Sequence, residues 1–168
     1  MSEFNRACVK GMQNEASRLI ADIETTYGFV IDRGGRIQTE WLSTCSGPVF
    51  GEWFLKLMHD GKICYVDASI NQCDKKHITI RCGLPKSSKD IVYIATANVT
   101  TIRYIVAEDP DFFDPKIKAL ANAIAKERAK QARNGCVCRY LRCQMRIRVG
   151  TVTHAVSELC SPAPPHQP

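Results

Sequence analysis

The stretch that decides the fold is RYIVAEDPDFFDPK, residues 103–116. It begins with an apolar, β-branched run from Tyr104 to Val106 and then places four carboxylates within seven residues. A nearly continuous apolar run between loops is typical of a strand buried on both faces, as in a parallel sheet. Ligands of open α/β sheets bind at the carboxyl ends of such strands. We therefore expect a strand at residues 102–107 that carries Asp109 and Asp111 to a site at its end.

The rest of the chain alternates between helical and strand patterns. Apolar residues recur at helical spacing in four segments, which are residues 5–27, 47–61, 114–135 and 152–159. Strands are expected from Phe29 to a turn at Gly34-Gly35, over residues 62–70, and over residues 136–149, where apolar side chains alternate with arginines. Residues 90–97 fit two structures: a short helix that Ser87 or Ser88 caps, or an apolar run that Asp90 opens directly.

This order of elements, without internal repeats or a linker, predicts an α/β fold. We expect a single three-layer domain over residues 1–160 with a mostly parallel central sheet, followed by a disordered tail at residues 161–168. Of the 168 residues, 45% are apolar and 24% are charged, which is typical of a soluble globular protein. No apolar run is long enough to span a bilayer and no signal-peptide pattern occurs, so we expect a cytoplasmic protein without a membrane partner.

The nine cysteines have two interpretations. Without an export signal they are expected to be reduced, to pack as small hydrophobes, and not to form disulfides. Alternatively, Cys136, Cys138 and Cys143, with Cys160 downstream, would bind zinc. The C-x-C-x4-C spacing matches none of the common zinc-finger patterns, so zinc is kept as a third hypothesis.

Basic residues are concentrated in one part of the chain. The net charge is +6, and Glu127 is the only acid between Lys116 and Arg148. Such a segment is typical of a surface that binds the phosphates of nucleic acid, although arginines on alternate positions also keep an edge strand soluble. The residues expected to contact nucleic acid are Lys126, Lys130, Arg139, Arg142, Arg146 and Arg148.

Two pairs of motifs resemble PIN-like nuclease domains. IVAEDPDF, preceded by KDIVYIATA, resembles the later half of these domains, and FVIDRGGRIQTEW followed by GPVFGEWFLKL resembles a bacterial subfamily. The match covers roughly residues 5–115. The resemblance implies that Glu40, Asp90 and Asp109 hold Mg²⁺ or Mn²⁺ and that Asp111 assists. It further implies a metal-dependent nuclease, with RNA as the expected substrate and a role as a toxin or defence effector.

One departure from the family leaves alternatives open. PIN-like domains begin with a central strand that ends in an aspartate ahead of the first helix, whereas this sequence starts almost at the helix. Either the start is truncated, or Asp32 substitutes for the missing ligand, or catalysis has been lost; Asp32 also fits a turn residue before Gly34. The second hypothesis is therefore a degenerate PIN-like module that binds RNA or a protein, such as an antitoxin-like partner or a second copy, without cleaving anything.

Overall fold

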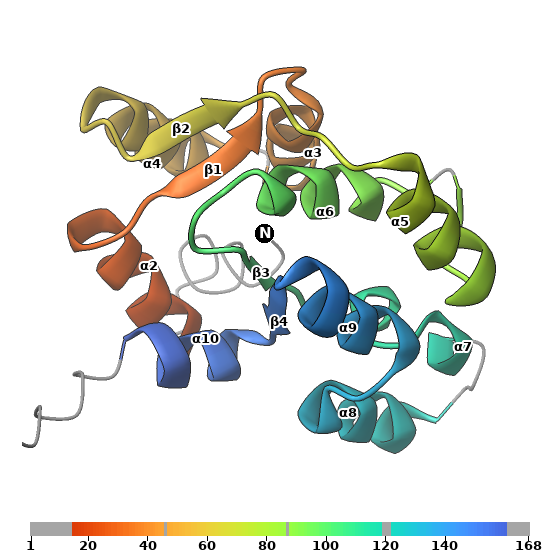
Figure 1. Cartoon of the computed structure of the whole chain (residues 1–168). Coiled ribbons are helices and arrows are strands. Elements are labelled where there is room, and N and C mark those ends of the chain that lie inside the picture. The colour runs from red at the N-terminus through yellow and green to blue at the C-terminus, as the bar shows by residue number, and fades with distance from the viewer. Residues whose placement is uncertain (1–14, 46, 87, 119–121, 161–168) are drawn as a thin grey trace, which may run out of the picture.

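The computed structural model describes residues 15–45, 47–86, 88–118 and 122–160, and helices make up most of it (Figure 1). The α-helices are α2 (Glu15–Thr25), α3 (Arg36–Thr44), α4 (Pro48–His59), α5 (Gln72–Lys76), α6 (Asp90–Asn98), α7 (Pro115–Lys118), α8 (Ala123–Ala132), α9 (Cys136–Tyr140) and α10 (Val152–Leu159). The π-helical turns η2 (His77–Arg81) and η4 (Leu141–Met145) continue α5 and α9, and η3 (Pro110–Phe112) is a 3-10 turn. Among these helices, none combines the length and apolar character needed to cross a membrane.

The strands form two separate parallel pairs. β1 (Phe29–Asp32) pairs with β2 (Ile63–Val66), and β3 (Tyr104–Val106) pairs with β4 (Arg148–Gly150). Parallel strands need a crossover between them, and here helical segments supply both crossovers. The described part of the chain is therefore an α/β fold with two small parallel sheets.

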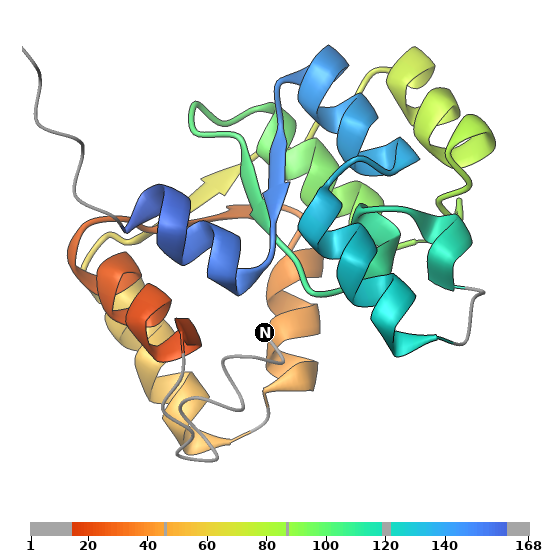
Figure 2. The ribbon, with the colours of Figure 1, turned by 90° about the horizontal axis from the view of Figure 1, so that it is seen from below.

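Helix α6 packs against both sheets. Its Ile94 belongs to a buried cluster that includes Ile105 of β3 and Leu141 of η4, while its Val92 contacts a second cluster around Ile31 of β1. In that second cluster the rings of Trp41 and Phe29 pack edge to face, with their centroids 5.1 Å apart. This is a favourable arrangement of aromatic rings. A third cluster joins α2 to α10, which lie side by side in Figure 2.

Several local predictions are confirmed. The strand at 102–107 exists as β3, and α4 and β2 lie within the predicted segments. Residues 152–159 form α10 with the predicted bounds. Asp90 opens helix α6, which decides between the two structures considered for residues 90–97. Residues 5–14 and the tail at 161–168 lie outside the described residues.

Two predictions are wrong. Residues 136–149 form α9 and η4, and only Arg148–Gly150 is a strand. The buried residues Val137, Leu141 and Met145 are four apart, so the same sequence also satisfies a helical face, and burial of that face decides the outcome. The single helix expected at 114–135 is divided into α7 and α8, with residues 119–121 outside the described part.

The expectation that the cysteines form no disulfide is also wrong for one pair. Cys82 and Cys136 are disulfide-bonded, with Cα atoms 5.2 Å apart. The separation is within the usual range for a disulfide. Cys82 follows η2 and Cys136 starts α9, so the bond joins two helical segments separated by 54 positions in the sequence.

Candidate carboxylate site

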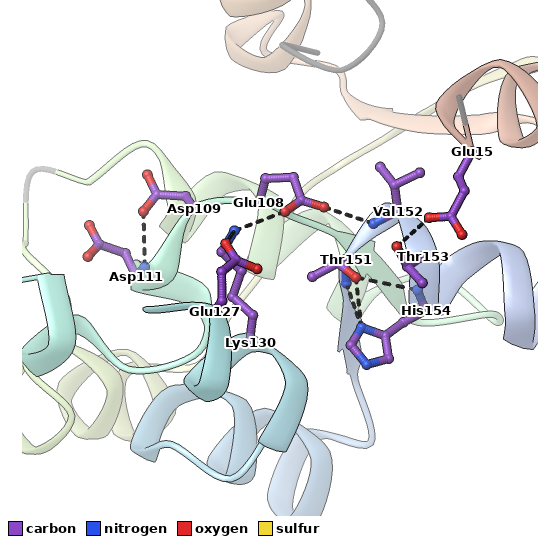
Figure 3. Close-up of polar contacts among 10 residues, drawn as sticks. All are labelled: Glu15, Glu108, Asp109, Asp111, Glu127, Lys130, Thr151, Val152, Thr153 and His154. Carbon is purple, nitrogen blue, oxygen red and sulfur yellow. Dashed lines mark hydrogen bonds and ion pairs between the residues drawn. The ribbon is translucent and has the colours of Figure 1, made fainter. Parts of the chain in front are cut away.

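Asp109 and Asp111 follow β3 in a tight turn. The Asp109 side chain is the N-cap of η3, and its Oδ1 accepts the backbone N–H of Asp111 at 3.0 Å (Figure 3). Asp109 is exposed, whereas Asp111 is only 5% exposed. Asp114 comes next and accepts the N–H of Lys116 at 3.1 Å, so it belongs to the start of α7, as expected for a carboxylate at a helix N-terminus.

Asp90 is held at the start of α6 by Ser88. The Ser88 hydroxyl donates to Oδ2 of Asp90 at 2.6 Å and accepts the backbone N–H of Asp90 at 3.1 Å. The first bond orients the half-buried Asp90 carboxylate, and the second holds the Ser88 hydroxyl beside it. The expected cap of α6 by Ser87 or Ser88 is not found: the N-cap is Lys89, without a side-chain cap hydrogen bond, and Ser88 contacts Asp90 instead.

The charges of the other three predicted carboxylates all act on Asp90. Burial raises the pKa of Asp90, the Ser88 hydrogen bond opposes this, and the negative charges of Asp109, Asp111 and Glu40 raise the pKa further. Like charges act in this way only at short range, because water and salt screen distant ones. The fold therefore brings together carboxylates from α3, from α6 and from the segment after β3.

A cavity of about 350 Å³ adjoins these carboxylates. Glu40, Asp90 and Asp109 line it together with the aromatic side chains of Trp41 and Tyr93. The Trp41 ring N–H donates to the Tyr93 hydroxyl at 3.0 Å. Burial raises the pKa of Tyr93, and the charge of Glu40 adds to that effect, so the phenol stays protonated beside the acids.

Asp32 does not join the cavity. It is 3% exposed, its Oδ2 accepts the N–H of Arg36 at 3.0 Å, and its Oδ1 accepts the N–H of Ile37 at 2.8 Å. Both oxygens therefore bind the first turn of α3, while Gly35, at φ 73°, makes the turn between them. Asp32 thus has the turn role expected for it, and it fixes the start of the helix that carries Glu40.

Glu108 organises the segment beside the site, a role that the sequence does not indicate. Its Oε2 accepts from Lys130 Nζ at 3.1 Å, and its Oε1 accepts the N–H of Val152 at 3.0 Å (Figure 3). Lys130 also donates to Glu127 at 2.7 Å. Burial by itself would lower the pKa of Lys130, but hydrogen bonds to Glu127 and Glu108 outweigh it and raise the pKa. We call these contacts the Glu108 bridge; it joins the end of β3 to α8 and α10.

The predicted nucleic-acid residues have different surroundings. Lys130 is 8% exposed and belongs to the Glu108 bridge. Arg148 pairs with Glu158 at 3.4 Å and its guanidinium lies 5.1 Å from the Tyr104 ring centroid. Lys126 is half-buried, and the exposed members of the set are Arg139, Arg142, Arg146 and Arg148. Arg139 lies on α9 and Arg142 on η4, so these two do not protect an edge strand.

The donor atoms of the carboxylate site are those that a hard cation would need. Carboxylates are the ligands that Mg²⁺ and Mn²⁺ prefer, and the mutual repulsion around Asp90 is of the kind that a cation relieves. Over the described ranges, however, no three His, Cys, Asp or Glu side chains lie close enough to share one ion. The carboxylate oxygens are suitable ligands for a hard cation, but the described side chains are too far apart to bind one cation together.

The zinc hypothesis loses a ligand. Cys136 is in the disulfide, and Cys138 is buried in the core, where burial raises the pKa of its thiol. Cys143 is exposed on η4, and Cys160 ends α10. Because zinc binds thiolates, a disulfide sulfur and a thiol of raised pKa make a poor ligand set.

No family model matches the chain, and neither a curated protein nor a solved structure is detectably similar to it. The resemblance to PIN-like domains therefore depends on the sequence motifs alone.

Proposed function

We propose that the chain is a divalent-metal-dependent nuclease that hydrolyses phosphodiester bonds, with RNA as the substrate. The observation that supports this most is the cavity that Glu40, Asp90 and Asp109 line together, where burial and the charges of Asp109, Asp111 and Glu40 raise the pKa of Asp90. A carboxylate whose pKa is raised by neighbouring acids beside a cavity is a candidate for a functional site. The order of the motifs in the sequence agrees with that interpretation.

In this proposal Glu40, Asp90 and Asp109 would hold Mg²⁺ or Mn²⁺, and Asp111 would support them. The bound cation would activate water and neutralise charge on the phosphodiester. Ser88 orients the Asp90 carboxylate, and the η3 turn directs Asp109. Exposed arginines such as Arg139 and Arg142 would contact backbone phosphates without regard to sequence.

We propose that the two parallel sheets are the halves of one PIN-like central sheet. Their common contact with α6 and their shared parallel pairing support this idea.

The test is cleavage of single-stranded RNA with Mn²⁺ or Mg²⁺ by the wild type and by Asp109→Asn. We expect the substitution to lower the rate more than about tenfold, because it removes a ligand charge. Asp114→Asn is the matched control: it removes a carboxylate from the same stretch that only caps α7, so its rate should equal that of the wild type. Equal rates for the wild type and Asp109→Asn would refute the assignment.

A second function is a module that binds RNA without cleaving it. It is favoured by the absence, in the described part of the chain, of three ligands gathered around one point. This function predicts binding that weakens steeply with salt, no cleavage with either metal, and no change in melting temperature when Mn²⁺ is added. A melting temperature that rises with Mn²⁺ in the wild type but not in Asp109→Asn would exclude it.

A further inference from the structure

Helix α3 has a polar face that borders a further cavity, next to the carboxylate cavity. The face consists of residues at the spacing i, i+3, i+4 and i+7, which are Arg36, Thr39, Glu40 and Ser43. The buried residues of the same helix, Ile37 and Trp41, recur four apart on another face. The polar face lines a cavity of about 330 Å³ together with Ser88 and Lys89 at the start of α6. A cavity of this size is within the range of small-ligand sites.

The hydroxyl groups of this cavity already donate hydrogen bonds within the chain. Those of Thr39, Ser43 and Ser88 donate to acceptors of the protein at 2.7, 2.8 and 2.6 Å. Apart from the phenol of Tyr93, the side-chain donors left for a ligand are the Arg36 guanidinium and the Lys89 ammonium. The cavity therefore favours a ligand that accepts hydrogen bonds from cations.

Arg36 and Lys89 are exposed and unpaired. Within residues 15–45, 47–86, 88–118 and 122–160, neither side chain has an ion pair or a hydrogen bond, although Glu40 lines the same cavity. The charges that act most on Asp90 are all negative, so Lys89 does not neutralise its neighbour in the sequence. Two free cations beside one cavity attract an anion, and phosphate combines negative charge with several acceptor oxygens.

This cavity shares a wall with the carboxylate cavity. Glu40 and Tyr93 line both, and Ser88 lines the first while its hydroxyl holds Asp90, which lines the second. By contrast, none of the basic residues expected between 126 and 148 to contact nucleic acid lines either cavity. Arg36 and Lys89 are thus cations beside the acids, and the sequence alone does not single them out.

We propose that this cavity, which we call the phosphate subsite, binds a backbone phosphate of an RNA strand whose neighbouring phosphodiester lies at the carboxylates. The identity of the ligand rests on the proposed nuclease function. The Arg36 guanidinium binds the phosphate oxygens with two parallel hydrogen bonds, and Lys89 adds a point charge. The charge of Glu40 disfavours an anion here, so both cations are needed for a net attraction. The strand then passes over Glu40 and Tyr93 from the subsite to Asp90.

The experiment measures RNA binding to the whole chain without metal. A fluorescein-labelled single-stranded RNA of about ten nucleotides is titrated by anisotropy in EDTA at several salt concentrations, because phosphate contacts make affinity depend on salt. The test variant is Arg36→Gln with Lys89→Gln. The matched control is Lys76→Gln with Arg81→Gln, which also removes two exposed positive charges, from α5 and η2, but lines neither cavity.

The two double variants should differ. We expect the test variant to bind the RNA roughly fivefold to tenfold more weakly than the wild type, and its plot of log affinity against log salt concentration to be less steep by about 0.7, the value for one phosphate of a single strand. The control should stay within about twofold of the wild type, with the same slope. If the test variant does not fold, Lys89→Gln and Lys76→Gln supply the same comparison singly.

Each result has a defined meaning. Equal affinities of the test and control variants, or no RNA binding by the wild type, overturn the proposal. If RNA binding is equal but inorganic phosphate raises the melting temperature of the wild type and not that of the test variant, free phosphate is the ligand and RNA is excluded. Because the assay contains no metal, it is separate from cleavage. A wild type that binds RNA through Arg36 and Lys89 but cleaves none refutes the nuclease and leaves the phosphate subsite in place.

Discussion

Removal of the Glu108 side chain should destabilise the protein through three of its segments at once. In Glu108→Ala, Lys130 loses one of its two carboxylate partners and the N–H of Val152 loses its acceptor. Lys130 has a side chain only 10% exposed, so water does not replace the lost partner fully. A hydrogen bond to a charged group contributes about 1.5–3 kcal/mol and a neutral one about 1 kcal/mol.

Solvent exposure of the Glu108 side chain reduces the contribution of its hydrogen bond to Lys130. The Glu108 side chain is 32% exposed and Glu127 remains bound to Lys130, so the charged bond is taken at the lower end of its range. The expected loss for Glu108→Ala is about 2–3 kcal/mol. Glu108→Gln keeps one acceptor oxygen, replaces the other by an NH₂ group that only donates, and loses the charge, so it should cost about 1–2 kcal/mol.

Urea unfolding followed by circular dichroism measures the free energy of unfolding of each variant. The matched control is Glu127→Ala, because Glu127 also bonds Lys130 but has a side chain 62% exposed. We expect the control to cost less than about 1 kcal/mol. If Glu108→Ala cost no more than Glu127→Ala, the Glu108 bridge would have no special role in the fold.

Three further predictions concern other buried groups. The pKa of Asp90 in the folded protein is raised above 3.8, so ionisation of its carboxyl group lowers the free energy of unfolding as pH rises through the folded pKa. Asp90→Asn should therefore stabilise the protein at pH 7 and have little such effect below pH 3.8. Urea unfolding at both pH values measures this difference. Thr96→Val replaces a buried hydroxyl that has no hydrogen-bond partner among the described residues by a methyl group. It should raise the free energy of unfolding by about 1 kcal/mol, whereas a loss of stability would show that the hydroxyl has a partner. The Cys82–Cys136 disulfide closes a loop between residues 54 positions apart and so restricts the unfolded chain. Its reduction should lower the free energy of unfolding by up to about 4 kcal/mol. We expect a reductant to lower the melting temperature of the wild type but not that of Cys136→Ser.

Features that depend on a short stretch of sequence were predictable. The strand before Asp109 follows from the apolar run that ends in acids, and α10 follows from helical spacing over eight residues. The segment after Cys136 was not predictable in the same way, because its residues satisfy both a strand and a helix. Only the contact of Val137 and Leu141 with the core decides between the two.

Features that depend on distant partners were not predictable. Glu108 finds Lys130 and Val152, which are 22 and 44 positions away. Alternation along a strand places neighbouring side chains on opposite faces, so it separates Glu108 from Asp109 but does not identify its partners. The disulfide likewise joins residues that only the packing of η2 against α9 brings together.

The Glu108 bridge holds in place the segment that carries Asp109 and Asp111, against the repulsion among the carboxylates. Mutual repulsion around Asp90 tends to push the segment after β3 away from α6, so that segment needs attachments that do not involve the cluster. Ala107 is bonded to Gly150, Glu108 to Lys130 and Val152, and Asp109 to its own turn. Positions fixed from outside allow the acids to stay close at an electrostatic cost, as is common where a fold accepts local strain for function. A cation bound in the cavity would remove this cost without any movement of the segment, so we expect Mg²⁺ or Mn²⁺, if it binds as proposed, to stabilise the protein.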